Sequence, residues 1–418
     1  MRSSLVVVLL ALVAAPAAAN AAPFAGRWNG VFHGGRGAQQ VLLICRPGAG
    51  GALGGLFYMS GDLVGPLENG TVSGDSLRFT VMNFSFHAHR EGDQMALVLR
   101  IANGNTHEMA LRFGSPDTSA LVQSPAAAAA ALARITVPWD QVPDSVLAAH
   151  RLAADVAVGP SDALRAGTLF LVGGGPSQAD LNAEFVRLAG GPKARIVVIP
   201  TAGVEPGQDA DALRQGDAWA KTLGVGHVTV LHTADRKQAD DGTFVNPLRD
   251  ATGVWLAGGE AGRILVSYLG TRTERELMAV LARGGVIGGT SAGALVWGSE
   301  CQTFGATTDA SPYRMGDANA LILDDPRSVC FGALRQVVVA PHFTEFRMQP
   351  ALAKTIAAKP RLLGIGIDEA TAFEVHGSVG TVLGRGHVTV LSGAAAGDTT
   401  RKALSAGTRY DLARGSMR

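Results

Sequence analysis

The stretch Gly285-Val286-Ile287-Gly288-Gly289-Thr290-Ser291-Ala292-Gly293-Ala294 passes from a short apolar run through Gly-x-Ser-x-Gly into a segment that can form a helix. A strand, a tight turn and a helix in this order are typical of an exposed nucleophile. The turn strains the serine backbone, and the small neighbours let a substrate approach the main chain. The N–H groups and dipole at the start of the helix favour a developing oxyanion. Ser291 is therefore the candidate nucleophile.

The sequence around this stretch alternates between strand-length apolar runs and helix-length segments. The strands are expected at residues 169–172, 196–199, 228–231, 254–257, 286–287, 336–339 and 364–367, and helical spacing covers 180–188, 210–223, 272–282 and 350–358. Such alternation predicts an α/β fold with a doubly wound, mainly parallel sheet that is covered by helices on both faces. We assign residues 167–418 to this domain, with a hairpin expected within 372–391.

The N-terminal half has a different rhythm, with short alternating apolar runs separated by glycine-rich turns. Strands are expected at residues 27–32, 40–45, 53–59, 76–82, 95–101 and 108–113. The pattern predicts an antiparallel β-domain over residues 22–114 and leaves open whether it closes as a barrel or stays an open sheet. Residues 115–166 are rich in Ala, Pro and Ser and are interpreted as a linker with some helix.

The overall charge is balanced, because 36 Lys and Arg residues face 35 Asp and Glu residues, for a net charge of +1. No general field attracts nucleic acid or an anionic membrane, so neither is an expected partner. Residues 1–21 resemble a signal peptide, with Arg2 before an apolar stretch and Ala19-Asn20-Ala21 as the cleavage site. We expect an exported protein, periplasmic or secreted, without membrane contact after cleavage.

Cysteine and histidine positions give little support for a metal or a redox centre. Cys301 and Cys330 could pair in an oxidising compartment, whereas Cys45 lies in an apolar strand and is expected to be buried. His87 and His89 share one face of an expected strand, but the sequence offers no third ligand. No metal is expected.

A glycine-rich turn at residues 173–175 follows the first strand of the α/β domain. Its spacing is not that of a dinucleotide-binding loop, and no acidic residue ends the next strand. The sequence therefore predicts neither NAD nor any other cofactor.

A serine nucleophile needs a base and an orienting carboxylate, which are expected at other strand ends of the same sheet. His342 follows the apolar run 337–341, and Asp368 and Glu369 follow the run 364–367. Either acid could orient the histidine. We expect these side chains to converge on Ser291, because parallel strands end at one edge of a sheet.

Three motifs carry a family resemblance: Gly-Thr-Ser-Ala-Gly-Ala at 289–294, His-Phe at 342–343 and Gly-Ile-Asp-Glu-x-Thr-Ala at 366–372. With them, residues 168–412 resemble the cyanophycinases and the related aspartyl dipeptidases. The resemblance implies a sheet like that of class I glutamine amidotransferases. It also implies a triad of Ser291 as nucleophile, His342 as general base and Glu369 as its orienting acid. Along the sequence the three residues follow the order Ser, His, acid, which differs from the order Ser, acid, His of α/β-hydrolases.

The resemblance also implies further contacts and shows where the chain departs from the family. The strand 254–256 leads into Gly258, Gly259 and Glu260, which face the nucleophile in relatives. The oxyanion donors are then the N–H groups of Ala292 and of Gly258 or Gly259, with Glu260 and Arg347 as substrate contacts. Relatives typically carry Asp or Gln before the histidine and several arginines after it. The corresponding residues here are Ala340, Pro341, Phe346, Met348 and Ala351.

The sequence thus predicts an exported serine hydrolase of the cyanophycinase type that cleaves a peptide or isopeptide bond through an acyl-enzyme. β-Aspartyl bonds are among the candidates, whereas the altered pocket argues against cyanophycin itself. Two alternatives stay open. One is a binding protein whose α/β domain has lost activity, and the other is a small-substrate esterase or amidase with the same triad. A homodimer is compatible with the sequence.

Overall fold

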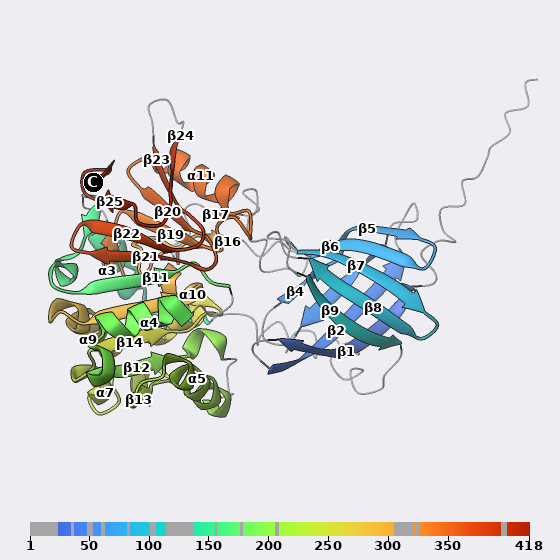
Figure 1. The fold of residues 1–418 in the computed structure, drawn as a ribbon, viewed down its shortest axis with the longest axis horizontal. Helices are drawn as coiled ribbons and strands as arrows, with labels where there is room; N and C mark the ends of the chain where they lie inside the picture. Colours follow the sequence, from blue (N-terminus) through green and yellow to red (C-terminus); the bar gives the residue numbers. More distant parts are fainter. Residues whose placement is uncertain are drawn as a thin grey trace, which may run out of the picture.

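The computed structural model describes residues 24–34, 37–47, 53–59, 63–81, 84–100, 106–113, 138–154, 157–175, 179–204, 209–304, 321–322, 327–393 and 399–418. The expected signal peptide and residues 115–137 of the expected linker lie outside these residues. The described elements form a β-rich N-terminal body and a larger α/β body (Figure 1).

The N-terminal body is a closed antiparallel barrel. Its nine strands have the order β2-β1-β9-β8-β7-β6-β5-β3-β4, and an additional pairing of β2 with β3 closes the sheet. Alternate side chains point inward, and Trp28, Phe57 and Phe86 are buried in the barrel core. The strands are β1 (Gly26–Gly34), β2 (Gly37–Pro47), β3 (Leu53–Met59), β4 (Leu63–Pro66), β5 (Glu68–Ser73), β6 (Ser76–Val81), β7 (Phe84–Glu91), β8 (Gln94–Arg100) and β9 (Thr106–Phe113).

The larger body is built on a mixed nine-stranded sheet. Its parallel half runs in the order β13 (His227–Val230), β12 (Arg195–Ile199), β14 (Gly253–Leu256), β15 (Val286–Thr290) and β11 (Thr168–Val172). An antiparallel half continues through β21 (Thr371–His376), β22 (Val379–Gly384), β25 (Arg409–Asp411) and β26 (Ser416–Met417). The central strands β11 and β14 are buried along their whole length, which explains their unbroken apolar sequence.

A second, four-stranded sheet contains two strands that were expected in the main sheet. β19 (Val337–Pro341) pairs in parallel with β20 (Leu363–Ile367), and β23 (Val388–Gly393) and β24 (Thr399–Leu404) complete it. The structure therefore differs from the predicted single sheet, and His342 does not follow a strand of the sheet that carries Ser291. A buried apolar run has the same pattern in either sheet, so periodicity could not separate the two.

Helices cover both faces of the parallel strands. α4 (Ala179–Leu188) and α5 (Asp209–Leu223) pack on one face, where Phe185 contacts Trp255, and α8 (Ala261–Tyr268) and α9 (Arg272–Ala282) pack on the other. α11 (Gln349–Ala358) covers the second sheet. The shorter elements are α6 (Arg236–Ala239), α7 (Asn246–Arg249), α10 (Ala292–Leu295), β10 (Gly159–Pro160), β16 (Thr303–Phe304), β17 (Leu321–Ile322), β18 (Leu334–Arg335), and single-turn helices η6 (Gly191–Lys193) and η7 (Thr201–Gly203).

The end of the segment interpreted as a linker packs into the α/β body. It forms η4 (Trp139–Gln141), α3 (Asp144–Ala154) and η5 (Asp162–Arg165), and Val142, Leu147 and Leu164 are buried in the main core. Residues 138–154 and 157–165 therefore belong structurally with the α/β domain, and the boundary lies before the predicted residue 167. The few buried positions of this short, alanine-rich segment are too widely spaced to produce a periodic pattern.

His150 attaches α3 to the rest of the domain, since its Nε2 lies 2.8 Å from Glu274 Oε1 on α9. Burial lowers the pKa of His150, but the hydrogen bond and charge of Glu274, together with the Val146 carbonyl, outweigh it, so the net pKa is raised. A raised pKa stabilises the fold below the unfolded value near 6.5, and this contribution disappears as pH rises through the folded pKa.

We therefore expect His150→Gln to lower the melting temperature more at about pH 5.5 than at about pH 8.5. Thermal denaturation of both proteins across this range measures the difference. A destabilisation that is the same at both pH values would show that the charge of His150 does not support the fold.

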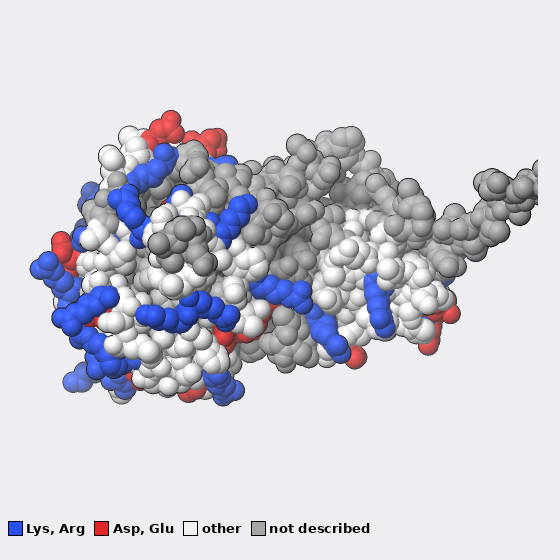
Figure 2. Space-filling model, turned by 90° about the horizontal axis from the view of Figure 1, so that it is seen from above, with Lys and Arg blue, Asp and Glu red and all other residues white. Residues whose placement is uncertain are grey.

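The structure has one disulfide, between Cys301 and Cys330, in its described part. Cys45 is buried in the barrel without a disulfide partner, and burial raises the pKa of its thiol to about 12. Within the described residues, no helix is long and apolar enough to cross a membrane. On the face drawn in Figure 2, Lys and Arg side chains outnumber the acidic ones and lie mostly over the α/β body.

Candidate active site

Three predicted residues from different strand ends meet in one hydrogen-bonded chain. Ser291 follows β15, His342 follows β19, and Glu369 lies just after β20. The Ser291 hydroxyl lies 2.8 Å from His342 Nε2, and His342 Nδ1 lies 2.8 Å from Glu369 Oε1. An imidazole that donates from Nδ1 to the carboxylate has Nε2 free to accept the serine proton. The side chains of His342 and Glu369 are only 13% and 12% exposed, so solvent screens this chain weakly.

Ser291 occupies the strained turn that its sequence predicts. Its φ of 55° and ψ of −117° lie outside the favoured regions for a residue with a side chain, and such conformations cost about 1–3 kcal/mol. The Ser291 N–H donates to the Val172 carbonyl at 3.0 Å and holds the turn against β11. A Cβ at Gly289 would lie 2.2 Å from the Gly293 carbonyl oxygen, and one at Gly293 would lie 2.2 Å from that of Leu256. Both glycines of Gly-x-Ser-x-Gly are therefore required by close backbone packing.

His342 is held by its backbone and by an aromatic ring. Its φ is 49°, and its N–H donates to the Gly173 carbonyl at 2.7 Å. The imidazole stacks on the ring of Phe346 with a centroid separation of 4.3 Å and an interplanar angle of 9°. These restraints leave the ring little freedom to turn away from Ser291.

The two candidate acids have different surroundings, and only Glu369 points to the histidine. Asp368 accepts hydrogen bonds from the Thr344 hydroxyl at 2.6 Å and from the His387 N–H at 3.0 Å, so it ties two loops together. The Glu369 N–H donates to Glu345 Oε2 at 3.1 Å. Burial raises the pKa of Glu345, and the nearby charges of Glu369 and Asp368 raise it further. The structure thus places Glu369, and not Asp368, in the hydrogen-bonded series that contains His342 and Ser291.

The turn of Gly173, Gly174 and Gly175 after β11 is part of the site, although the sequence analysis assigned these glycines no role there. A Cβ at Gly174 would lie 2.1 Å from His342 Cε1, and one at Gly175 would lie 2.7 Å from Glu369 Oε2. Both glycines also have positive φ, 109° and 81°. The sequence indicated a role in the site only through three glycines after the first strand of an α/β domain. At such a position, side chains from neighbouring strand ends leave room for backbone alone.

The predicted oxyanion donors lie around Ser291. A Cβ on Gly258 would lie 3.1 Å from Ser291 Cβ, so the turn after β14 touches the nucleophile. Gly259 has a φ of 139°, and a Cβ there would overlap the Ala202 carbonyl. Within the described residues, no backbone acceptor is found for the N–H groups of Gly258, Gly259 or Ala292. This is compatible with their predicted role as oxyanion donors.

Glu260 and Arg347, the two predicted substrate contacts, have different surroundings. Glu260 caps α8, because its Oε1 accepts a hydrogen bond from the Gly262 N–H at 3.1 Å. Arg347 is exposed and has a φ of 52° in the turn between β19 and α11. Its position, five residues after His342, is compatible with a substrate contact.

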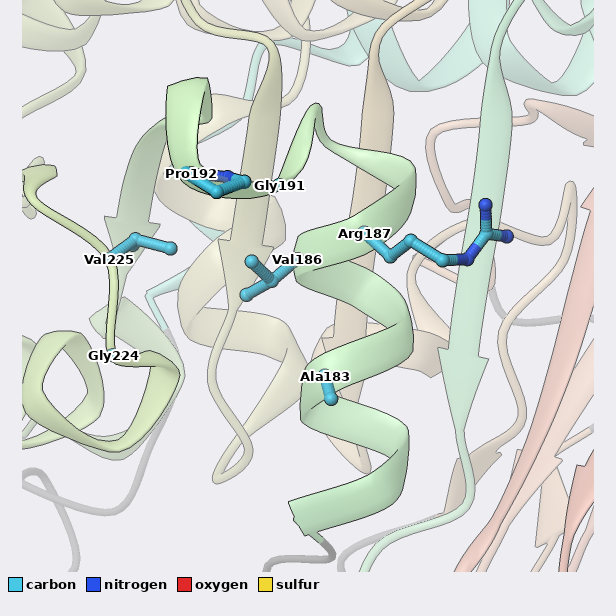
Figure 3. A pocket seen from close by; sticks show the side chains of 7 residues that line it. All are labelled: Ala183, Val186, Arg187, Gly191, Pro192, Gly224 and Val225. Carbon is cyan, nitrogen blue, oxygen red and sulfur yellow. The ribbon is translucent and has the colours of Figure 1, made fainter.

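The described residues hold no alternative metal cluster, and one apolar hollow of the α/β body lies away from this site. The described residues contain no group of three potential metal-ligating His, Cys, Asp or Glu side chains, and His87 and His89 both lie on the outer face of β7. An apolar hollow of about 300 Å³ lies between α4 and the loop of Gly224 and Val225, with Arg187 pointing away from that loop (Figure 3). It is at the amino ends of the strands, whereas Ser291 is at a carboxyl end.

The site combines a nucleophile turn, a histidine and a carboxylate, which are joined by hydrogen bonds on an α/β fold. This is the arrangement of a serine hydrolase. Residues 169–383 match the model of peptidase family S51, and the chain belongs to this family of serine-type peptidases. The predicted resemblance to cyanophycinases is confirmed by this match. The barrel, residues 24–113, lies outside the matched region.

Curated relatives are cyanophycinases. The chain is 34% identical to the cyanophycinase of Thermosynechococcus vestitus over 210 residues, which are 50% of this chain and 61% of that protein. It is 32% identical to that of a Nostoc species over 234 residues, or 54% of this chain and 73% of the relative. A crystal structure of a peptidase from an acI-B1 actinobacterium aligns with a TM-score of 0.47 and 26% identity, covering 60% of this chain and 98% of that one.

Proposed function

We propose that the chain is an exported peptidase that hydrolyses a peptide or isopeptide bond with Ser291, His342 and Glu369 as its catalytic triad. The observation that carries the proposal is the continuous chain from serine hydroxyl to imidazole to carboxylate, with 2.8 Å at each link. Membership of a serine-type peptidase family supports the same chemistry.

The reaction begins when Ser291 Oγ attacks the amide carbonyl and His342 Nε2 takes the hydroxyl proton. Glu369 stabilises the imidazolium through Nδ1–H, and the N–H groups of Ala292 and of Gly258 or Gly259 bind the oxyanion. The C–N bond breaks as His342 returns the proton to the leaving amine. Water, deprotonated by the same histidine, then hydrolyses the acyl ester and regenerates the serine.

The substrate class follows from the family together with this chain's own pocket. The two curated relatives reported above are cyanophycinases, so isopeptides and β-aspartyl peptides are the first substrates to consider. Phe346 stacks on His342 where a cyanophycinase would typically offer basic side chains, and Arg347 is the one basic residue in the turn. The pocket therefore favours a bond whose neighbouring side chain is not arginine.

Export is supported by two features. Residues 1–21 have the charge, apolar run and small-residue cleavage site of a signal peptide. The Cys301–Cys330 disulfide is of the kind that persists in oxidising compartments.

A substrate panel tests the proposed activity. Cyanophycin, α-aspartyl dipeptides and β-aspartyl dipeptides are incubated with wild type and with Ser291→Ala, and release of free amine is followed. We expect serine-dependent release from β-aspartyl peptides and little from cyanophycin. If nothing is released and an activated phosphonate also fails to label the protein, the α/β domain is a binding scaffold and the proposal is wrong.

A further inference from the structure

An aromatic contact joins the barrel to the candidate catalytic histidine. The ring of Phe84, the first residue of β7, lies 5.5 Å from the ring of Phe346 in an edge-to-face arrangement. Phe346 in turn stacks flat on His342. Phe84 also packs against the barrel core, and Phe346 packs against the core beneath α11. Two rings therefore connect the hydrophobic interior of the barrel to the triad.

The strand that supplies Phe84 also forms a groove on the outer face of the barrel. The groove, of about 480 Å³, crosses β6, β7 and β8. Two rows of paired residues define it: Arg78, His87 and Val98 form one, and Thr80, Ser85 and Arg100 form the other. Ser85 is adjacent to Phe84, so the second row lies at the end of β7 that reaches the triad. On the inner face of the same strands, beneath the groove, Phe79 and Phe86 are each 2% exposed and stacked on each other.

Basic side chains predominate along the lining of the groove, although Glu68 on β5 is paired with Thr80 in the register. Arg78, His87 and Arg100 are exposed, and none of the lining residues is acidic. Glu108 on β9 is paired with Val98 in the register, but no ion pair joins it to Arg100 within the described structure. From strand spacing, the Cα atoms of Arg78 and Arg100 are about 12 Å apart, the span of roughly four residues of an extended chain.

The basic and hydroxyl side chains of the groove fit carboxylates better than they fit nucleic acid. Arginine forms paired hydrogen bonds with a carboxylate, and Ser85 adds a hydroxyl next to Arg100 in the register, whereas the Thr80 hydroxyl already accepts a hydrogen bond from the Asn69 amide at 3.1 Å. A single-stranded nucleic acid would need exposed aromatic rings for stacking, whereas Phe79 and Phe86 are buried. The net charge of +1 also provides no wider attraction for a polyanion.

We propose that this groove binds the side-chain carboxylates of an acidic polypeptide. Phe84 then forms a wall of the active site, and the bound polypeptide passes beside it to reach Ser291. This inference rests on the proposed peptidase function and names its substrate class. It gives the barrel, which the family match does not include, a role in selecting substrate.

Binding is tested without turnover in the full-length Ser291→Ala protein. A fluorescent ten-residue aspartate peptide is titrated and followed by anisotropy. We expect the double variant Arg78→Gln/Arg100→Gln to weaken binding by about tenfold or more, since two charge-assisted contacts are lost. Arg112→Gln, an exposed arginine on β9 outside the groove, is the matched control and should bind like its parent. The affinity should also fall with added salt.

Three outcomes would overturn the inference: a double variant that binds like its parent, an equal loss in the Arg112→Gln control, or equal binding of a single-stranded DNA of the same length. In the active enzyme, Phe84→Ala should raise KM for acidic peptides while phosphonate labelling of Ser291 is retained, and Phe84→Leu should restore part of the lost affinity. Failure of phosphonate labelling would concern the peptidase proposal alone, because anisotropy does not depend on catalysis.

Discussion

Replacing Ser291 with alanine is expected to lower kcat/KM by at least about four orders of magnitude against any substrate that the wild type cleaves. The alanine side chain cannot form the acyl-enzyme, and any remaining rate would come from the oxyanion donors and substrate binding. Steady-state hydrolysis measures the loss. Ser405→Ala changes an exposed serine in the turn after β24 and should leave the rate unchanged.

The size of the loss distinguishes a nucleophile from a structural serine. Ser291 has strained backbone angles, and Ala at the same position relieves none of that strain. A folded Ser291→Ala protein with a near wild-type rate would mean that another group attacks the carbonyl.

The second large effect is expected from Gly174→Ala. A Cβ at this position would lie 2.1 Å from His342 Cε1, so the imidazole must move away from Ser291 or the turn must shift. Displacement of a catalytic group by about 1 Å can cost on the order of a hundredfold in rate, and we expect a loss of at least that size. Hydrolysis kinetics measure it, while circular dichroism and thermal denaturation report on folding.

Gly190→Ala is the matched control for this substitution. Gly190 also has positive φ, 110°, but the nearest atoms to a Cβ there would be 3.9 Å away. It should therefore incur a similar backbone strain and leave the rate unchanged. If both variants lose activity equally, backbone strain explains the result and Gly174 has no specific relation to His342.

The local features of the site could be predicted because each is encoded within a few residues. Gly289 and Gly293 are required by contacts with neighbouring backbone, and the turn at Ser291 gives a recognisable pattern. His342 and Glu369 stand directly after buried apolar strands, and apolar runs of this kind are visible in the sequence alone. The family resemblance rests on these three motifs together and is confirmed.

Sheet membership could not be predicted, because it depends on pairing between distant segments. β19 and β20 are apolar in the same way as β11 and β14, yet they belong to a separate sheet. The closure of the barrel depends similarly on the pairing of β2 with β3, and no local pattern contains that information. The contact of Phe84 with Phe346 joins residues 262 positions apart in the sequence (346 − 84), on elements that belong to different domains.

The choice between the two acids was also beyond sequence reasoning without the resemblance. Asp368 and Glu369 are adjacent and both follow β20, but their side chains point to different partners. Their roles separate only when the Thr344 hydroxyl and the His387 N–H are found to bind Asp368.

The most direct test of the proposed triad is to label the full-length protein with an activated alkyl phosphonate and to locate the adduct by peptide mass spectrometry. We expect one adduct, on Ser291, which is lost in Ser291→Ala and strongly slowed in His342→Gln, because the hydroxyl then has no base. An adduct on another residue, or labelling of Ser291 at an unchanged rate in His342→Gln, would contradict the claim that these residues act together.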